Sequence, residues 1–187
     1  MNTMKDIKGI IFDYGGTIDT NSRHWAEVLW GKYAETGIPV CKQDFRNAYV
    51  HAERALAKHP YIRSEHNFHD VLAVKTRIQL EFLADAALLP KDNALLQAYG
   101  TKVTDLCYAY VLEVLDTTRP VIQQLAERYR LVLVSNFYGN IQTILQDFGL
   151  SDYFVHVIEP AVVGVRKPDP AIYRLGVEAM DYSADQV

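Results

Sequence analysis

The feature that most constrains the fold is a short apolar run that ends in a carboxylate and two glycines. The run is Ile10-Ile11-Phe12, within a predicted strand of residues 8–12, and residues 13–17, Asp-Tyr-Gly-Gly-Thr, follow it directly. Four to eight apolar residues between turn residues are typical of a strand that is covered on both faces. We therefore predict a buried parallel strand with Asp13 at its carboxyl end, where open α/β sheets bind their ligands.

The two glycines give the turn after this strand unusual conformational freedom. Gly15 and Gly16 allow positive φ angles and a close approach of backbone N–H groups to an anion. The alternative is a plain Asx turn, in which the Asp13 side chain only closes the strand. These residues alone leave an anion-binding turn and a structural turn equally open.

The segment that follows this turn indicates a separate helical domain. Between about Ser22 and Asp116, apolar residues recur at helical spacing in four segments, and no convincing strand pattern appears. Four amphipathic helices in a row can bury their apolar faces against one another as a small bundle. We therefore predict an inserted four-helix-bundle cap domain formed by residues 20–115.

Strand and helix alternate again after the predicted cap. We expect a helix from Thr118-Arg119-Pro120, strands at residues 131–134 and 154–158 with a helix between them, and a last helix from about Pro170. Such alternation argues for a parallel sheet with right-handed crossovers. The predicted fold is thus α/β, with a Rossmann-like parallel sheet core made of residues 1–19 and 116–187.

Composition and charge narrow the range of partners. A net charge of −4 gives no electrostatic reason to expect nucleic acid or an anionic membrane surface. The sequence starts without a secretory signal, and no apolar run approaches the length that spans a bilayer. Cys41 and Cys107 are far apart, which is typical of reduced thiols. We expect a cytoplasmic protein that acts on a small molecule, and the oligomeric state stays open.

Three polar side chains are expected at the ends of successive strands, namely Asp13, Ser135 and Lys167. Crossovers of one hand place these ends at the same edge of the sheet. A carboxylate, a hydroxyl and an ammonium suit attack on a phosphoryl group, because the first forms an acyl phosphate and the others stabilise its charge. Taken singly, Ser135 is more typical of a helix cap and Lys167 of a solvated cation. Their joint placement favours a catalytic site.

These motifs resemble those of the haloacid dehalogenase-like hydrolases. The similarity lies in residues 10–17, in Ser135-Asn136 and in residues 164–170, Gly-Val-Arg-Lys-Pro-Asp-Pro, in the order found in the subgroup whose cap follows the first strand. The resemblance implies that Asp13 is the nucleophile and that Lys167 is the cation that holds nucleophile and phosphoryl group. It also implies the following substrate-binding residues and magnesium ligands: Ser135, Asn136, Gly16 and Thr17 for the substrate, and Asp13 with the Gly15 carbonyl for Mg²⁺.

One departure from the family pattern concerns the general acid. The phosphatases usually carry a second Asp two residues after the nucleophile, and this chain has Gly15 there. General acid catalysis contributes roughly 10²–10⁴-fold, so ester cleavage should be slower unless another group serves. Asp19 is one candidate, although a helix-capping role suits it better, and His24 is another. Members that cleave carbon–phosphorus or carbon–halogen bonds also lack this Asp, so that chemistry stays open.

A second departure concerns the end of the sequence. Family members continue into a fourth strand with acids that complete the Mg²⁺ site, whereas this sequence ends at Val187. Asp13 alone makes a weak Mg²⁺ site, and without a fourth strand the backbone edge of the first strand is exposed. We therefore expect a core that lacks its last strands, as in a shortened version of a longer protein.

Specificity is expected in the cap, where His59, His66 and His69 interrupt two helical patterns. Their spacing is not that of a zinc site, so we expect a surface loop that faces the crevice and contacts the leaving group. The leading hypothesis is a Mg²⁺-dependent phosphohydrolase that acts on a small phosphorylated metabolite through an aspartyl phosphate. The alternatives are a phosphonatase or dehalogenase, or a binding protein with an impaired site.

Overall fold

The computed structural model describes residues 6–187 and contains a three-stranded parallel sheet. Strands β1 (Gly9–Phe12), β2 (Arg130–Val134) and β3 (Phe154–Ile158) lie in the order β1-β2-β3. The register places Gly9 opposite Arg130 and Phe12 opposite Leu133. The sheet confirms the predicted parallel α/β core, and β1 lies at its edge.

Helices cover both faces of this sheet. Leu131 and Leu133 of β2 pack into the larger core, whereas Val132 and Val134 pack into a smaller cluster with α7 (Pro170–Glu178). Gly176 allows this close approach, because a Cβ atom there would lie only 2.9 Å from Ile11 Cδ1. The other short elements of the core are α5 (Ile141–Asp147), η1 (Ser151–Tyr153), α6 (Pro160–Val163) and η2 (Ala184–Gln186).

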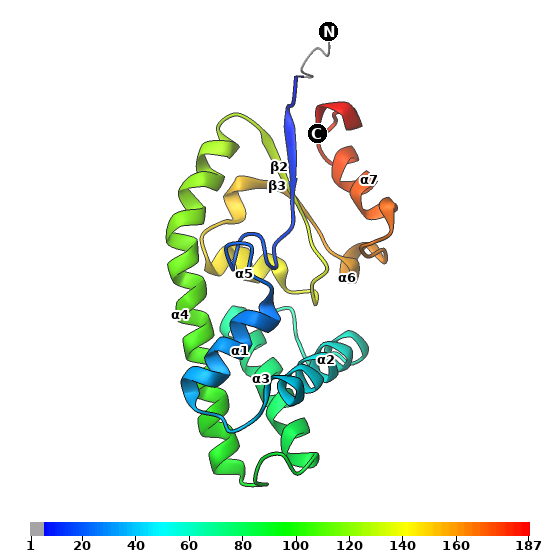
Figure 1. The fold of residues 1–187 in the computed structure, drawn as a ribbon. Helices are drawn as coiled ribbons and strands as arrows, with labels where there is room; N and C mark the ends of the chain where they lie inside the picture. The colour runs from blue at the N-terminus through cyan, green and yellow to red at the C-terminus, as the bar shows by residue number, and fades with distance from the viewer. Residues whose placement is uncertain (1–5) are drawn as a thin grey trace.

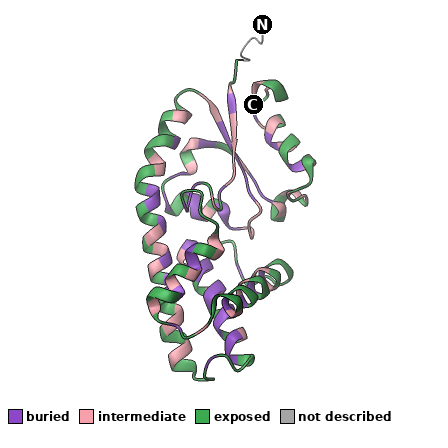
Figure 2. Ribbon diagram, in the orientation of Figure 1, coloured by how far each residue is buried: buried purple, intermediate pink, exposed green. Residues whose placement is uncertain are grey.

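Four helices pack together beyond the carboxyl end of the sheet (Figure 1). They are α1 (Trp25–Thr36), α2 (Lys42–Lys58), α3 (Phe68–Asp85) and the first part of α4 (Asn93–Ala126). Each turns an apolar face inward, which Figure 2 shows as buried positions on the facing sides of the ribbons. This packing corresponds to the helical bundle that the apolar spacing predicts.

Helix α4 differs from the expected pattern of two helices separated near Asp116. It is one continuous helix that runs along both the bundle and the sheet, with Pro120 inside it (Figure 1). A proline cannot donate a backbone hydrogen bond, and this predicted a helix start at that position. The buried stripe of Val111, Leu115 and Ile122 nevertheless continues past the proline and holds the helix in one piece. The domain boundary predicted at residue 116 falls inside α4 and stays a prediction.

The edge of β1 is contacted by the last residues of the chain. The Lys8 N–H donates to the Gln186 carbonyl at 2.8 Å, and no further strand pairs with β1 among residues 6–187. This agrees with the expectation that the core lacks its last strands and leaves the first strand at an edge. Over the same residues, no helix combines the length and apolar character that crossing a membrane requires.

Candidate active site

The carboxyl end of the sheet brings together the side chains of Asp13, Ser135 and Lys167. The Ser135 hydroxyl donates to Asp13 Oδ1 at 3.0 Å, and Lys167 Nζ lies 2.6 Å from Asp13 Oδ2. The Asp13 side chain remains 43% exposed, whereas Ser135 is buried and the Lys167 side chain is 15% exposed. A carboxylate that is held by two donors is thus still accessible to a ligand.

Two structural alternatives for these residues can be compared with the geometry. The Tyr14 N–H donates to Asp13 Oδ1 at 2.8 Å, which is a contact to the next residue and not the contact two residues on that defines an Asx turn. Ser135 is not a helix cap, because Asn140 holds the cap position of α5. The hydroxyl of Ser135 is therefore directed to the carboxylate of Asp13.

Lys167 was expected near the end of a strand, but it does not follow β3 directly. It lies in the loop between α6 and α7, and Glu159 instead comes directly after β3. Glu159 is 4% exposed and accepts from the Gly139 N–H at 2.9 Å, and burial raises the pKa of its carboxyl group. Asn136 holds the lysine loop, because its amide donates to the Lys167 carbonyl at 3.0 Å and accepts from the Lys167 N–H at 2.9 Å.

This bidentate contact leads to a prediction for Asn136→Ala. The variant loses both hydrogen bonds to the Lys167 backbone, and we expect kcat to fall by about 10- to 100-fold because misplaced catalytic groups lose that much. The effect should be on kcat more than on KM, with little change in the unfolding temperature. Steady-state kinetics and thermal unfolding together check this. Unchanged kcat would show that the Lys167 loop keeps its position without the amide.

The glycine turn is organised by a buried acid. Gly16 has a φ of +84°, and its N–H donates to Asp19 Oδ1 at 2.7 Å, while Trp25 Nε1 donates to Asp19 Oδ2 at 2.8 Å. Asp19 is 0% exposed, and burial raises its pKa to about 6 against the lowering effect of these hydrogen bonds. The Gly16 N–H is therefore engaged by the protein, which favours the structural turn of the two alternatives, and Gly15 has no positive φ angle.

A cavity of about 280 Å³ lies between this end of the sheet and the helical bundle. Asp13, Gly15 and Gly16 line it from the sheet side, as do Ser135, Asn136 and Lys167. Thr17 is exposed and does not line this cavity, so its predicted substrate contact has no support in the geometry. The opposite side, which we call the cap wall, has a polar part formed by His24, Tyr49, Glu53 and Lys75 and an apolar part formed by Trp25, Phe68, Val71 and Leu72.

The cap wall holds a charged pair that no motif in the sequence indicates. Lys75 Nζ lies 2.7 Å from Glu53 Oε1, and the Tyr138 hydroxyl donates to Glu53 Oε2 at 3.3 Å. The ammonium also lies 5.9 Å and 5.8 Å from the ring centres of Tyr49 and Tyr138. Burial lowers the pKa of the Lys75 amine, but Tyr138 and Glu53 raise it by more. The net pKa is therefore raised, and the amine stays protonated. The sequence did contain one signal for a buried cation, because Lys75 lies on the buried face of α3, four residues after Val71.

His24 lines the same cavity and begins α1. Its Nδ1 accepts from the Ala26 N–H at 3.1 Å, and its ring lies edge-on to Tyr49 with the ring centres 6.1 Å apart. A ring nitrogen that accepts a hydrogen bond carries no proton, so the neutral imidazole has its N–H on Nε2. Its Nε2 is therefore the ring nitrogen that is left to donate a hydrogen bond.

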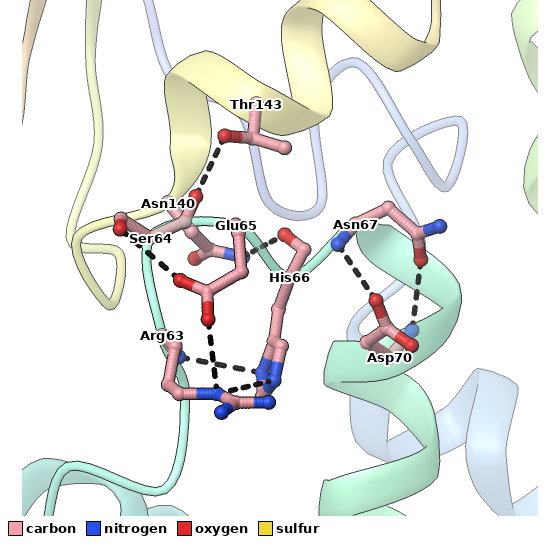
Figure 3. A network of polar contacts seen from close by, with 8 residues as sticks. All are labelled: Arg63, Ser64, Glu65, His66, Asn67, Asp70, Asn140 and Thr143. Carbon is pink, nitrogen blue, oxygen red and sulfur yellow. Dashed lines mark hydrogen bonds and ion pairs between the residues drawn. The ribbon is translucent and has the colours of Figure 1, made fainter.

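The histidine segment between α2 and α3 attaches the bundle to the core. Figure 3 shows that the Asn140 amide donates to the His66 carbonyl and the Thr143 hydroxyl to the Ser64 carbonyl, at 2.8 Å and 2.6 Å. The His66 ring contacts Arg63, and His69 pairs with Asp105 of α4. Neither residue lines the cavity beside Asp13, and His59 lines a neighbouring groove, so the expected contact with the leaving group has no support in the geometry.

The predicted magnesium ligands, Asp13 and the Gly15 carbonyl, make a sparse set of donors. Asp13 and Gly15 line the cavity, but the Asp13 carboxylate already contacts Ser135 and Lys167. Within residues 6–187, no three His, Cys, Asp or Glu side chains are grouped so as to hold a metal ion. A single carboxylate that is paired with a lysine does not fit Mg²⁺, and magnesium binding by this chain stays a prediction.

Comparisons with known proteins agree with this geometry. A structure of the HAD-hydrolase YfnB from Bacillus subtilis bound to magnesium is 19% identical, with a TM-score of 0.52, and the match covers 97% of this chain and 76% of that one. L-2-haloacid dehalogenase from Xanthobacter autotrophicus with chloropropionic acid covalently bound is 18% identical, with a TM-score of 0.50 and coverages of 97% and 68%. A dehalogenase with an intermediate complex is 13% identical, with a TM-score of 0.57 and coverages of 98% and 75%. At these identities the likeness concerns the fold.

Comparison with curated protein sequences gives no match. The family model for haloacid dehalogenase-like hydrolases, however, matches residues 7–187, which is nearly the whole chain and includes all three converging side chains. The α/β core with an inserted helical bundle is the fold that the sequence resemblance implied. The chain therefore belongs to the haloacid dehalogenase-like hydrolases.

Proposed function

We propose that this hydrolase cleaves a small phosphorylated metabolite through an aspartyl phosphate formed on Asp13. The observation that carries the proposal is the placement of Asp13, whose two carboxylate oxygens contact a hydroxyl and an ammonium at the floor of a cavity. A carboxylate is a common nucleophile in covalent hydrolysis, and the two donors stabilise negative charge on the attacked group.

The reaction would proceed in two displacements at phosphorus. An Asp13 oxygen attacks the phosphorus atom, the bond from phosphorus to the ester oxygen breaks, and the leaving group departs with that electron pair. Water then attacks phosphorus, releases inorganic phosphate and restores the carboxylate. The Ser135 hydroxyl donates to a phosphoryl oxygen, and the Lys167 ammonium offsets the negative charge in both steps.

Neither of the two acids that the sequence suggested is free to protonate the leaving group, and the carboxylate of Glu53, which lines the cavity, is paired with Lys75. Asp19 is fully buried, and both of its oxygens accept hydrogen bonds from Gly16 and Trp25. The Nδ1 atom of His24 accepts from the Ala26 N–H, so that nitrogen has no proton to give to a leaving group. We therefore expect substrates whose leaving group is stable as an anion, because general acid catalysis worth roughly 10²–10⁴-fold is lacking.

The same observation favours a second candidate, attack of Asp13 on carbon with release of halide. A halide leaves without a proton, so a site with Gly15 in place of an acid suits that reaction as well. Both reactions use the same nucleophile but give different covalent intermediates, an acyl phosphate or an ester.

Trapping of the intermediate tests the proposal. The protein is mixed with an activated aryl phosphate, quenched in acid and digested, and we expect the mass of one phosphoryl group on the peptide that contains Asp13. In heavy-oxygen water, a single turnover should place the label in the released phosphate. Label found in the Asp13 carboxyl group after reaction with a 2-haloacid would instead establish the second candidate. Phosphate binding without turnover of either substrate would point to a binding protein.

A further inference from the structure

Two cations face the cavity from opposite sides, and each is paired with a carboxylate. Lys167 pairs with Asp13 at 2.6 Å on the sheet side, and Lys75 pairs with Glu53 at 2.7 Å on the cap wall. In the proposed reaction Lys167 serves the phosphoryl group. Lys75 therefore faces the rest of the substrate, the part that becomes the leaving group.

Lys75 has hydrogen-bonding capacity to spare. Glu53 Oε1 lies 2.7 Å from Lys75 Nζ and Oε2 accepts from the Tyr138 hydroxyl, but the buried Oε1 makes no hydrogen bond. An ammonium has three N–H groups, and over the described residues the Glu53 carboxylate is its ion-pair partner, while Tyr49 and Tyr138 face it with their rings. The ammonium thus keeps donor capacity for a ligand. His24, on the same wall, also offers a donor, so the cap wall suits a group that accepts hydrogen bonds.

A purely structural role explains this pair less well. Burying an ion pair has a desolvation cost that often exceeds its Coulombic gain, and an apolar pair is usually as stable. The Lys75 side chain is only 10% exposed. Lys91 and Asp85 form a pair with the same 2.7 Å distance, but their side chains are 69% and 75% exposed, as expected of an ordinary surface contact. A buried cation that lines a cavity is better explained by an anionic ligand.

We infer that Lys75 binds a carboxylate on the part of the substrate that lies opposite the group attacked by Asp13, so that the substrate is a small carboxylic acid. This inference rests on the proposed function, because it assigns the opposite side of the cavity to the group attacked by Asp13. A cavity of about 280 Å³ has room for only a small second anion, and a carboxylate is compact and accepts hydrogen bonds in its plane. Lys75 then acts as the specificity-determining residue of the cap.

The test measures binding without turnover in an Asp13→Asn background. Calorimetry compares phosphoenolpyruvate, whose leaving group is a stabilised enolate, with the primary amide of the same compound, which keeps the size and removes the carboxylate charge. We expect the acid to bind about 10- to 100-fold more tightly than the amide, the range for a hydrogen bond to a charged group. Adding Lys75→Met should abolish this preference, whereas adding Lys91→Met should leave it intact. An equal preference in both double variants would overturn the inference.

A second variant separates specificity from folding. Lys75→Met leaves Glu53 without its cation, and this can destabilise the bundle. The combined Glu53→Gln and Lys75→Met change removes both charges, and thermal unfolding verifies that it folds. Loss of the preference for the acid in this folded protein supports the role of Lys75. A retained preference contradicts it.

A failure of the inference about Lys75 can be distinguished from a failure of the phosphatase proposal. The same comparison is made with 2-chloropropanoate and its amide in the protein with Asp13 intact. If Lys75→Met removes the preference for the chloro acid while no phosphate ester is cleaved, the role of Lys75 stands and the phosphatase proposal fails. If acid and amide bind equally in both substrate series, the inference about Lys75 is wrong, whichever reaction Asp13 performs.

Discussion

Asp13→Asn is expected to lower kcat/KM for an activated aryl phosphate by about 10⁴- to 10⁶-fold, the loss typical of removing a covalent nucleophile. An amide is a far weaker nucleophile than a carboxylate. It also lacks the charge that pairs with Lys167 across 2.6 Å, although it can still accept from the Ser135 hydroxyl. Steady-state kinetics with the purified variant, together with thermal unfolding, measure the effect.

Asp116→Asn is a suitable control for this variant. Asp116 is an exposed acid on α4, away from the cavity, and the exchange makes the same chemical change. We expect its activity to equal that of the unchanged protein. If Asp13→Asn were as active as Asp116→Asn, the nucleophile would have to be another group, and the aspartyl-phosphate proposal would be wrong.

The sequence predicted the framework of the site well, because local patterns determine it. The apolar run before Asp13 and the run before Ser135 both form parallel strands, and the ends of these strands meet at one edge. The helical stripes also predicted the bundle. Pro120 was misleading, since its missing N–H suggested a helix start, whereas the buried stripe on both sides of it keeps α4 continuous.

The details that determine specificity depend on contacts between distant segments. Glu53 and Lys75 lie on different helices, and their contact appears only when α2 and α3 pack side by side. Asn136 fixes Lys167 across 31 positions of sequence, which no short motif expresses. The glycine turn looked suited to an anion, but Gly16 donates its N–H to Asp19, and the packing that buries Asp19 is not visible in the sequence.

The buried carboxyl of Asp19 should make the stability of the fold depend on pH in an unusual direction. Burial raises the pKa of Asp19 from 3.8 to about 6, so between these values the folded state binds more protons than the unfolded state. The contribution of Asp19 to the free energy of unfolding is therefore largest below pH 3.8 and is lost as the pH rises through 6. Most paired carboxylates in proteins have the opposite effect.

Comparison with Asp19→Asn isolates this contribution, because every other titrating group is shared by the two proteins. We compare the unfolding free energy of the original protein with that of the variant at each pH. Relative to the variant, the original protein should be about 3 kcal/mol more stable at low pH than at neutral pH. Urea unfolding at a series of pH values measures it. A difference that does not change with pH would contradict the raised pKa.

A spectroscopic measurement tests the same proton at the site itself. Trp25 Nε1 donates to Asp19 Oδ2 at 2.8 Å, so protonation of the carboxyl weakens this contact and changes the surroundings of the indole. In a Trp30→Phe background, where Trp25 is the remaining tryptophan, its fluorescence should titrate with a midpoint near 6. Adding Asp19→Asn should abolish the titration. Asp19 also accepts from the Gly16 N–H, so its protonation would loosen the turn beside Asp13. As the pH is lowered, activity should therefore fall with the same midpoint as the change in fluorescence.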